Sequence, residues 1–176
     1  MTNDNKRKGT AWESAVRDYL NRELGLLDED SRLRDPFFWG NARRPAQEGS
    51  KDVADVHVVP FVLECKYVKR STIPGFLRQA ETEADNAGFP FGVAVVKTRG
   101  VAVRRGKVYF TVRTWTRIRH LLGMDTDSMR KLYGFTPFTR GIDSGRWYLR
   151  CDLDAFAALV EDVRVVYGPG VIRAVR

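Results

Sequence analysis

Asp55, Glu64 and Lys66 are the residues of this chain whose types and spacing best suit metal-assisted chemistry. They lie in two β-prone segments, residues 53–59 and 61–68, that flank a proline, and such a pair of segments predicts a hairpin. If the turn lies at that proline, Asp55 faces Glu64 across the two strands. Because side chains alternate along a strand, Glu64 and Lys66 share one face of the second strand. The sequence therefore predicts two carboxylates and one ammonium group gathered at one place.

Two neighbouring carboxylates repel each other, and a divalent cation between them removes that repulsion. Mg²⁺ suits such a pair because it prefers oxygen ligands, keeps several water molecules and binds substrate phosphates, and Mn²⁺ is the expected substitute. Lys66 would lower the pKa of an attacking water or stabilise the charge on a pentacovalent phosphate. Two alternatives stay open. The three side chains also fit the solvated polar face of an ordinary hairpin, and Asp52 rivals Asp55 because a longer loop would bring Asp52 opposite Glu64.

Two helices are expected to bring further polar side chains to this place. Apolar residues at helical spacing predict a helix over residues 10–24, and Glu13 lies at the edge of its buried stripe, from which it can reach the end of the sheet. The alternative for Glu13 is a capping box in which it bonds back to Thr10. Residues 73–86 predict a second helix, with a proline in its first turn and a glycine after its end. Gln79 on this helix would orient a water or a phosphate, or is simply a polar helix residue.

The remaining elements complete an α/β pattern. Further strands are predicted at 91–97, 108–113 and 147–151, and a helix follows the last of them. Alternation of this kind is typical of an α/β domain with a mixed sheet and helices on its faces. The 176 residues suit one domain, with a core at about 6–113 and a basic extension with a C-terminal strand and helix at about 114–176.

Four short motifs together resemble the PD-(D/E)XK nuclease superfamily, and particularly the Holliday-junction-resolvase-like endonucleases of archaea and phages. The resemblance covers roughly residues 6–97, and the stretch after Lys97 matches the family poorly. Alanine stands where the family has the proline of its P-D motif. The matching segments are Lys8-Gly9-Thr10-Ala11-Trp12-Glu13 for the opening K-G-x-x-x-E, Ala54-Asp55-Val56 for P-D-hydrophobic, Phe61-Val62-Leu63-Glu64-Cys65-Lys66 for the strand ending in E-x-K, and Gln79 for the helix glutamine.

The resemblance implies a restriction-endonuclease-like mixed β-sheet flanked by helices. It implies one or two Mg²⁺ ions at Asp55 and Glu64, with Glu13 as a further acidic participant and Lys66 as the catalytic base-side residue. It also implies a homodimeric endonuclease that hydrolyses phosphodiester bonds in branched DNA. The alternatives are a restriction- or recombination-type nuclease acting on linear or single-stranded DNA, a catalytically silent DNA-binding module, and an interaction protein whose basic face binds an acidic partner.

Positive charge is concentrated in the second half of the chain. The formal net charge is +8, and the stretch from Arg99 to Arg150 holds 12 Lys and Arg residues against three acids. Such a region is the electrostatic footprint expected for phosphate contacts, although a solvated surface is the alternative. The residues predicted to contact nucleic acid are Lys8, Arg104, Arg105, Lys107, Arg113, Arg117 and Arg119.

Composition argues against several other classes of protein. No apolar run approaches the roughly 18–20 residues that a membrane span needs, and the polar N-terminus lacks the apolar segment of a signal peptide. Cys65 and Cys151 are far apart and indicate reduced thiols, and the chain has only two histidines, which argues against a His/Cys zinc site. We therefore expect a cytoplasmic protein with no membrane partner, in the bacterial host cytoplasm if the gene belongs to a phage.

Overall fold

The computed structural model describes residues 3–46, 52–68, 72–139 and 147–172. Each helix and strand predicted above has a counterpart in it. In chain order the elements are α1 (Asn3–Glu23), β1 (Val56–Val58), β2 (Phe61–Lys66), α2 (Ile73–Ala87), β3 (Phe91–Val96), the 3₁₀ helix η1 (Val103–Arg105), β4 (Lys107–Thr111), α3 (Val112–Leu121), α4 (Thr126–Tyr133), β5 (Thr136–Phe138), β6 (Tyr148–Asp152) and α5 (Leu153–Ile172).

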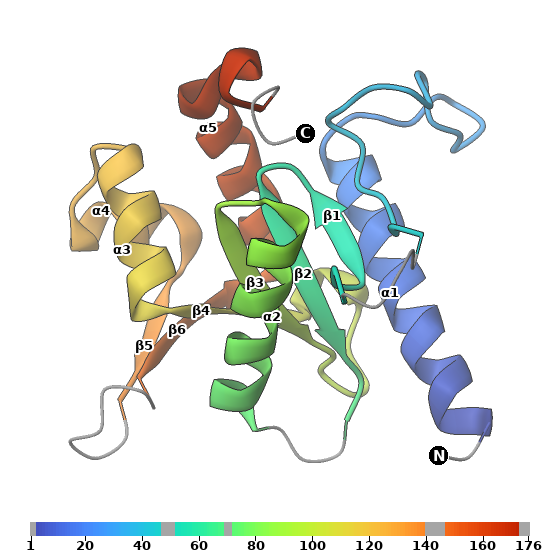
Figure 1. Ribbon diagram of the computed structural model, residues 1–176, viewed down its shortest axis with the longest axis horizontal. Helices are drawn as coiled ribbons and strands as arrows, with labels where there is room; N and C mark the ends of the chain where they lie inside the picture. Colours follow the sequence, from blue (N-terminus) through green and yellow to red (C-terminus); the bar gives the residue numbers. More distant parts are fainter. Residues whose placement is uncertain (1–2, 47–51, 69–71, 140–146, 173–176) are drawn as a thin grey trace.

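The described strands form one six-stranded sheet in the order β1-β2-β3-β4-β6-β5. The central strands β2 and β3 run parallel and are connected through α2, whereas every other neighbouring pair is antiparallel. Helices lie on both faces of this sheet (Figure 1). The predicted α/β class, a mixed sheet flanked by helices, is therefore confirmed.

Alternating side chains divide the core between the two faces of the sheet. Phe61 and Leu63 of β2 belong to the larger core, which α1 and α5 cover, and the Phe61 ring centroid lies 5.1 Å from that of Phe156. On the opposite face α2 packs Leu77 into a smaller cluster that contains Tyr109. Residues of β2 that alternate with Phe61 and Leu63 consequently face α2.

The β1–β2 hairpin has the register that the sequence predicts. The two strands are antiparallel, with Val56 opposite Leu63. Continued by one residue, this register places Asp55 opposite Glu64. The turn is tight, so the longer loop that would have favoured Asp52 is absent from this part of the described chain. Asp52 lies before the start of β1 and is exposed.

Helix α1 begins at Asn3, well before the predicted start at residue 10. Thr10 therefore lies inside the helix, and the capping box between Thr10 and Glu13 is wrong because a cap requires the first of these residues to precede the helix. Gly25 follows the helix with a φ of 65°, a left-handed conformation that glycine adopts without strain. Lys8, Gly9 and Glu13 thus all lie on one continuous helix.

The described residues of the stretch 114–176 belong to the same sheet and core. Strand β6 pairs with β4 over Lys107–Thr111, next to the centre of the sheet. Helix α5 buries Leu153, Phe156 and Leu159 completely in the larger core. Among the described residues no helix is long and apolar enough to cross a lipid bilayer.

Gly92 on β3 provides a test of how closely α2 packs on the sheet. A Cβ atom at Gly92 would lie 2.2 Å from the backbone oxygen of Ala80, which belongs to α2. We expect Gly92→Ala to lower the free energy of unfolding by about 1–3 kcal/mol or more, measured by urea denaturation, because helix and strand must move apart. The control is Gly9→Ala, where the nearest atom lies at 3.8 Å. That change should stabilise α1 by about 0.5–1 kcal/mol, and an unaffected Gly92→Ala protein would contradict the described packing.

Candidate active site

Asp55 and Glu64 form a pair of carboxyl groups at the open end of the hairpin. Glu64 is only 3% exposed and lies on the face of β2 that α2 covers. Asp55 Oδ2 accepts a hydrogen bond from the backbone N–H of Cys65 at 2.7 Å. Burial, and after it the charge of Asp55, raises the pKa of Glu64 to about 9. Burial also raises the pKa of Asp55, although its hydrogen bonds with Cys65 and Glu64 act in the opposite direction. At neutral pH the pair therefore retains a proton unless a cation replaces it.

The residue before Asp55 has an unusual backbone conformation. Ala54 has a φ of 71°, in the left-handed region that costs a non-glycine residue about 1–2 kcal/mol. A proline is fixed near a φ of about −65° and could not adopt this conformation. The alanine that departs from the P-D motif is therefore compatible with this backbone, whereas the proline of that motif is not.

Lys66 is a fixed cation beside the carboxyl pair. Its Nζ forms an ion pair with Glu64 Oε1, and its side chain is 24% exposed. Burial disfavours its charge, but the hydrogen bond to Glu64 and the charges of Glu64 and Asp55 outweigh burial and raise the pKa of Lys66. Its ammonium group also lies 5.6 Å from the centroid of the Phe76 ring. Lys66 is consequently protonated at neutral pH.

Gln79 reaches the carboxyl pair through a residue that the sequence analysis missed. Its Nε2 donates a hydrogen bond to Glu83 Oε1 at 2.8 Å, one helical turn further along α2. Glu83 is 2% exposed, and its Oε2 is buried without a hydrogen-bond partner. Burial raises the pKa of Glu83 to about 7, against the hydrogen bond from Gln79 and the interaction with the Glu64 carboxyl group, and the charges of Asp52 and Asp55 add to the rise. The signal that could have revealed Glu83 is its i,i+4 spacing from Gln79, which puts both on one face of the helix.

Glu13 lies close to the pair but is held by a second residue that the sequence analysis missed. Its Oε2 forms an ion pair with Arg44, and its side chain is 16% exposed. Burial and then the charge of Asp55 raise the pKa of Glu13, against the nearby charges of Arg44 and Lys66. Arg44 comes from the irregular segment after α1, where no periodic pattern marks one arginine out from its neighbours.

A groove of about 1090 Å³ runs past Asp55 and Lys66. One wall is the first half of α1, and the other includes Arg44, Pro45 and the turn after β3. Acidic lining residues are present, but cations are the more numerous. The cationic lining residues are Lys6, Lys8, Arg44, Lys66 and Arg99. Of the residues predicted to contact nucleic acid, Lys8 is the one that lines this groove; it is also ion-paired with Asp4.

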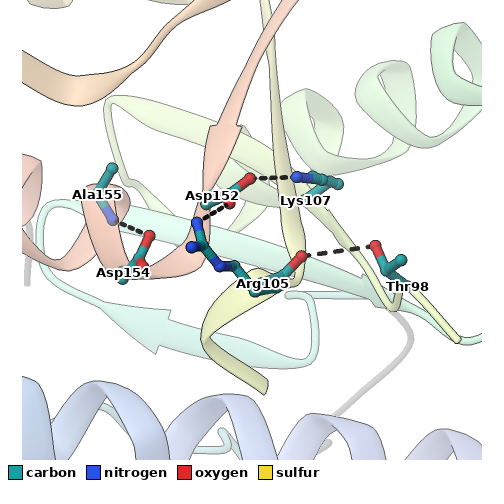
Figure 2. A network of polar contacts seen from close by, with 6 residues as sticks. All are labelled: Thr98, Arg105, Lys107, Asp152, Asp154 and Ala155. Carbon is teal, nitrogen blue, oxygen red and sulfur yellow. Dashed lines mark hydrogen bonds and ion pairs between the residues drawn. The ribbon is translucent and has the colours of Figure 1, made fainter. Parts of the chain in front are cut away.

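The other predicted nucleic-acid contacts lie elsewhere on the described surface. Arg105 and Lys107 both form ion pairs with Asp152 at the β6–α5 junction, the former at 2.8 Å (Figure 2). Thr98 Oγ1 donates to the backbone oxygen of Arg105 at 3.5 Å in the same network. Arg105 and Lys107 therefore hold η1 and the start of β4 to the end of β6. Arg104 lies next to them in η1 and is exposed.

The three arginines of α3 lie on the surface of that helix, and none of them lines the groove. Arg117 donates to the carbonyl of Pro90 at 3.0 Å, and Arg119 donates to the carbonyl of Met124 at 3.1 Å. Arg113 is exposed. The charge-rich stretch thus contributes Arg99 to the groove.

The donor set at the carboxyl pair fits a magnesium ion that keeps most of its water. Within the described residues, no three His, Cys, Asp or Glu side chains are arranged as a ready metal site. Mg²⁺, however, is commonly held by one or two carboxylates together with water and substrate phosphate. Glu64 supplies a buried carboxyl group, Asp55 a partly buried one, and Glu83 a buried oxygen without a hydrogen-bond partner.

Comparison of the chain with family models, with curated proteins and with solved structures found no match.

The pKa of Glu64 predicts how stability depends on pH. The folded protein keeps the proton of Glu64 up to about pH 9, whereas the unfolded chain loses it near the ordinary value of 4.5. Between these values the folded state binds more protons, so the free energy of unfolding falls as the pH rises. Glu64→Gln removes this contribution. In EDTA, the variant should gain about 1–3 kcal/mol on the wild type between about pH 5 and pH 9, measured by urea denaturation. Parallel pH profiles for the two proteins would contradict the raised pKa of Glu64 in the folded protein.

Proposed function

We propose that this protein is a metal-dependent DNA endonuclease of the PD-(D/E)XK type, with a restriction-endonuclease-like sheet. The observation that carries the proposal is the convergence of Asp55, Glu64 and Lys66 at the end of one hairpin, beside a groove rich in cations. Three residues of these types, held in the register that the motifs imply, are difficult to explain by folding alone. A buried acid pair costs stability, and such costs are usually retained for function.

Asp55 and Glu64 would hold one or two Mg²⁺ ions, with Mn²⁺ as substitute. The bound metal supplies Lewis-acid stabilisation of the phosphate charge and a water of lowered pKa. In the hydrolysis, the oxygen of water forms a bond to phosphorus and the water gives up one proton to solvent. The phosphorus–oxygen bond to the leaving sugar breaks, and the leaving oxygen takes a proton from solvent. Asp55 is held for this task by the N–H of Cys65, because that hydrogen bond fixes its Oδ2.

Lys66 stabilises negative charge on the phosphate rather than removing a proton. It is protonated at neutral pH because Glu64 and Asp55 lie beside it, and a protonated amine is no base. A preorganised cation in a partly buried site is worth much more than one in water. The base-side role that the family resemblance suggests is thus narrowed to an electrostatic one.

Glu13 and Gln79 act as positioning residues in this proposal. Glu13 holds the guanidinium of Arg44 at the edge of the groove, where it can meet a phosphate. Gln79 fixes the carboxyl group of Glu83 close behind Glu64. Lys8 and Arg99 would contact neighbouring phosphates of the same strand, and Arg104, Arg105, Lys107, Arg113, Arg117 and Arg119 lie outside the groove.

Branched DNA as substrate and a homodimer as the active form belong to the proposal through the family resemblance. Two active sites related by a twofold axis would cut two strands of a junction symmetrically. A nuclease that acts on linear or single-stranded DNA would keep the same residues in the same roles. The two readings therefore differ in substrate shape and agree on the chemistry.

The test is cleavage of a synthetic four-way DNA junction and of a linear duplex with the same sequence, in Mg²⁺ and in EDTA. We expect symmetric cuts in the junction that require the metal and little cutting of the duplex. Equal cutting of both substrates would retain the nuclease and remove the preference for branched DNA. Binding of both DNAs without cutting would contradict the enzyme and favour a silent DNA-binding module.

Matched variants assign the metal ligands. Asp55→Asn and Glu64→Gln should each lower the rate of cleavage by about 100-fold or more, because each removes a charge that would hold the metal. Asp52→Asn is the control, since Asp52 is exposed and lies outside the hairpin. It should retain activity within about threefold. If Asp52→Asn abolished cleavage and Asp55→Asn did not, the assignment would be reversed.

A further inference from the structure

A second cavity lies beside the groove and shares a wall with it. Its volume is about 390 Å³, within the range of about 300–1,000 Å³ that is typical of ligand pockets. It is enclosed by the irregular segment after α1, the β1–β2 turn and the connection from α2 to β3. Arg44 and Pro45 line both the cavity and the groove. One ligand could therefore occupy the cavity and the groove at the same time.

The lining of this cavity suits a flat aromatic group attached to an anion. Three aromatic residues, Trp39, Phe89 and Tyr167, and three prolines form its walls. Its charged lining residues are Arg43 and Arg44, and none of the described lining residues is acidic. Aromatic rings bind other rings by stacking, and arginines at the rim favour a phosphate or carboxylate.

The walls are held in place by Arg164 of α5. Its Nε donates to the carbonyl of Val59 at 2.7 Å, and its Nη2 donates to the carbonyl of Gly40 at 2.8 Å. Its guanidinium carbon also lies 5.4 Å from the centroid of the Trp39 ring. One partly buried cation thus fixes the β1–β2 turn and the Trp39 segment relative to each other. A cavity with fixed walls loses little entropy when a ligand enters.

We propose that this cavity binds an unpaired nucleobase of a DNA strand whose phosphates lie in the groove. The proposal rests on the proposed function and deepens it by naming the substrate class: DNA with an unstacked base next to the scissile bond. Arg44, at the shared wall, contacts the phosphate of the inserted nucleotide, and Trp39 stacks on its base. Because an unpaired base costs the least to unstack, the cavity selects distorted DNA over perfect duplex.

The test uses a duplex that carries one bulged 2-aminopurine, whose fluorescence reports stacking, and a fully paired duplex with the same label. Both are titrated with the full-length protein in EDTA, so that binding is measured without cleavage. We expect the bulged duplex to bind about tenfold more tightly than the paired one, with a change in 2-aminopurine emission on binding. Equal affinity for the two duplexes, or no change in emission, would overturn the proposal. So would saturation of the cavity by deoxyadenosine monophosphate with no preference for the bulge, since that indicates a small-molecule site.

Trp39→Leu should abolish the preference for the bulged duplex, and Phe37→Leu is its matched control. Phe37 belongs to the same segment, is 89% exposed and does not line the cavity. Tyr167→Leu is the second variant, and it replaces Trp39→Leu if thermal unfolding shows that the latter does not fold. Retention of the preference in a folded Trp39→Leu or Tyr167→Leu protein would overturn the proposal.

Cleavage assays separate this proposal from the nuclease itself. Cleavage in Mg²⁺ without base insertion would contradict the nucleobase site in the cavity and support the proposed nuclease activity. Base insertion without cleavage in Mg²⁺ would support the nucleobase site in the cavity and contradict the proposed nuclease activity.

Discussion

The site depends on the repulsion between two carboxyl groups that the chain holds opposite each other. The register of the β1–β2 hairpin places Asp55 across from Glu64. Because the turn between the strands is tight, the two residues cannot move apart without breaking the strand pairing. Burial under α2 removes the water that would otherwise weaken their interaction. The pair can be relieved by a shared proton or by a cation. The rise in the pKa of Glu64 to about 9 is the first of these states.

The surrounding side chains can be understood as responses to that repulsion. Lys66 lies against Glu64 on the same strand, and Arg44 pairs with Glu13 from a segment that is distant in the sequence. Because each of these cations lies beside an acid, a phosphate that approaches the site meets both positive and negative groups and not acidic groups alone. Arg44 then links the acidic site, the groove and the aromatic cavity, since it contacts Glu13 and lines both hollows.

Local rules were sufficient for the hairpin and insufficient for its surroundings. The period of two along a strand and the proline between the strands predicted Asp55 opposite Glu64, and a glycine predicted the end of α2. The early start of α1 was missed because its first turns are polar and carry no apolar periodicity. Arg44 was missed because its role depends on a contact across the fold, and the i,i+4 spacing of Glu83 from Gln79 does not by itself show that Glu83 is buried beside Glu64. The same reason explains why Arg105 and Lys107, predicted to face phosphates, are paired with Asp152.

The most direct test of this account is calorimetric titration of Mg²⁺ into the protein without DNA, at about pH 7.5 and in two buffers with different enthalpies of ionisation. We expect Mg²⁺ to bind and to displace the proton that Asp55 and Glu64 share, so that the measured heat depends on the buffer. Asp55→Asn should abolish this binding. Absence of binding in the wild type, or the same binding heat in wild type and Asp55→Asn, would contradict the claim that the carboxyl pair is a site for a divalent cation.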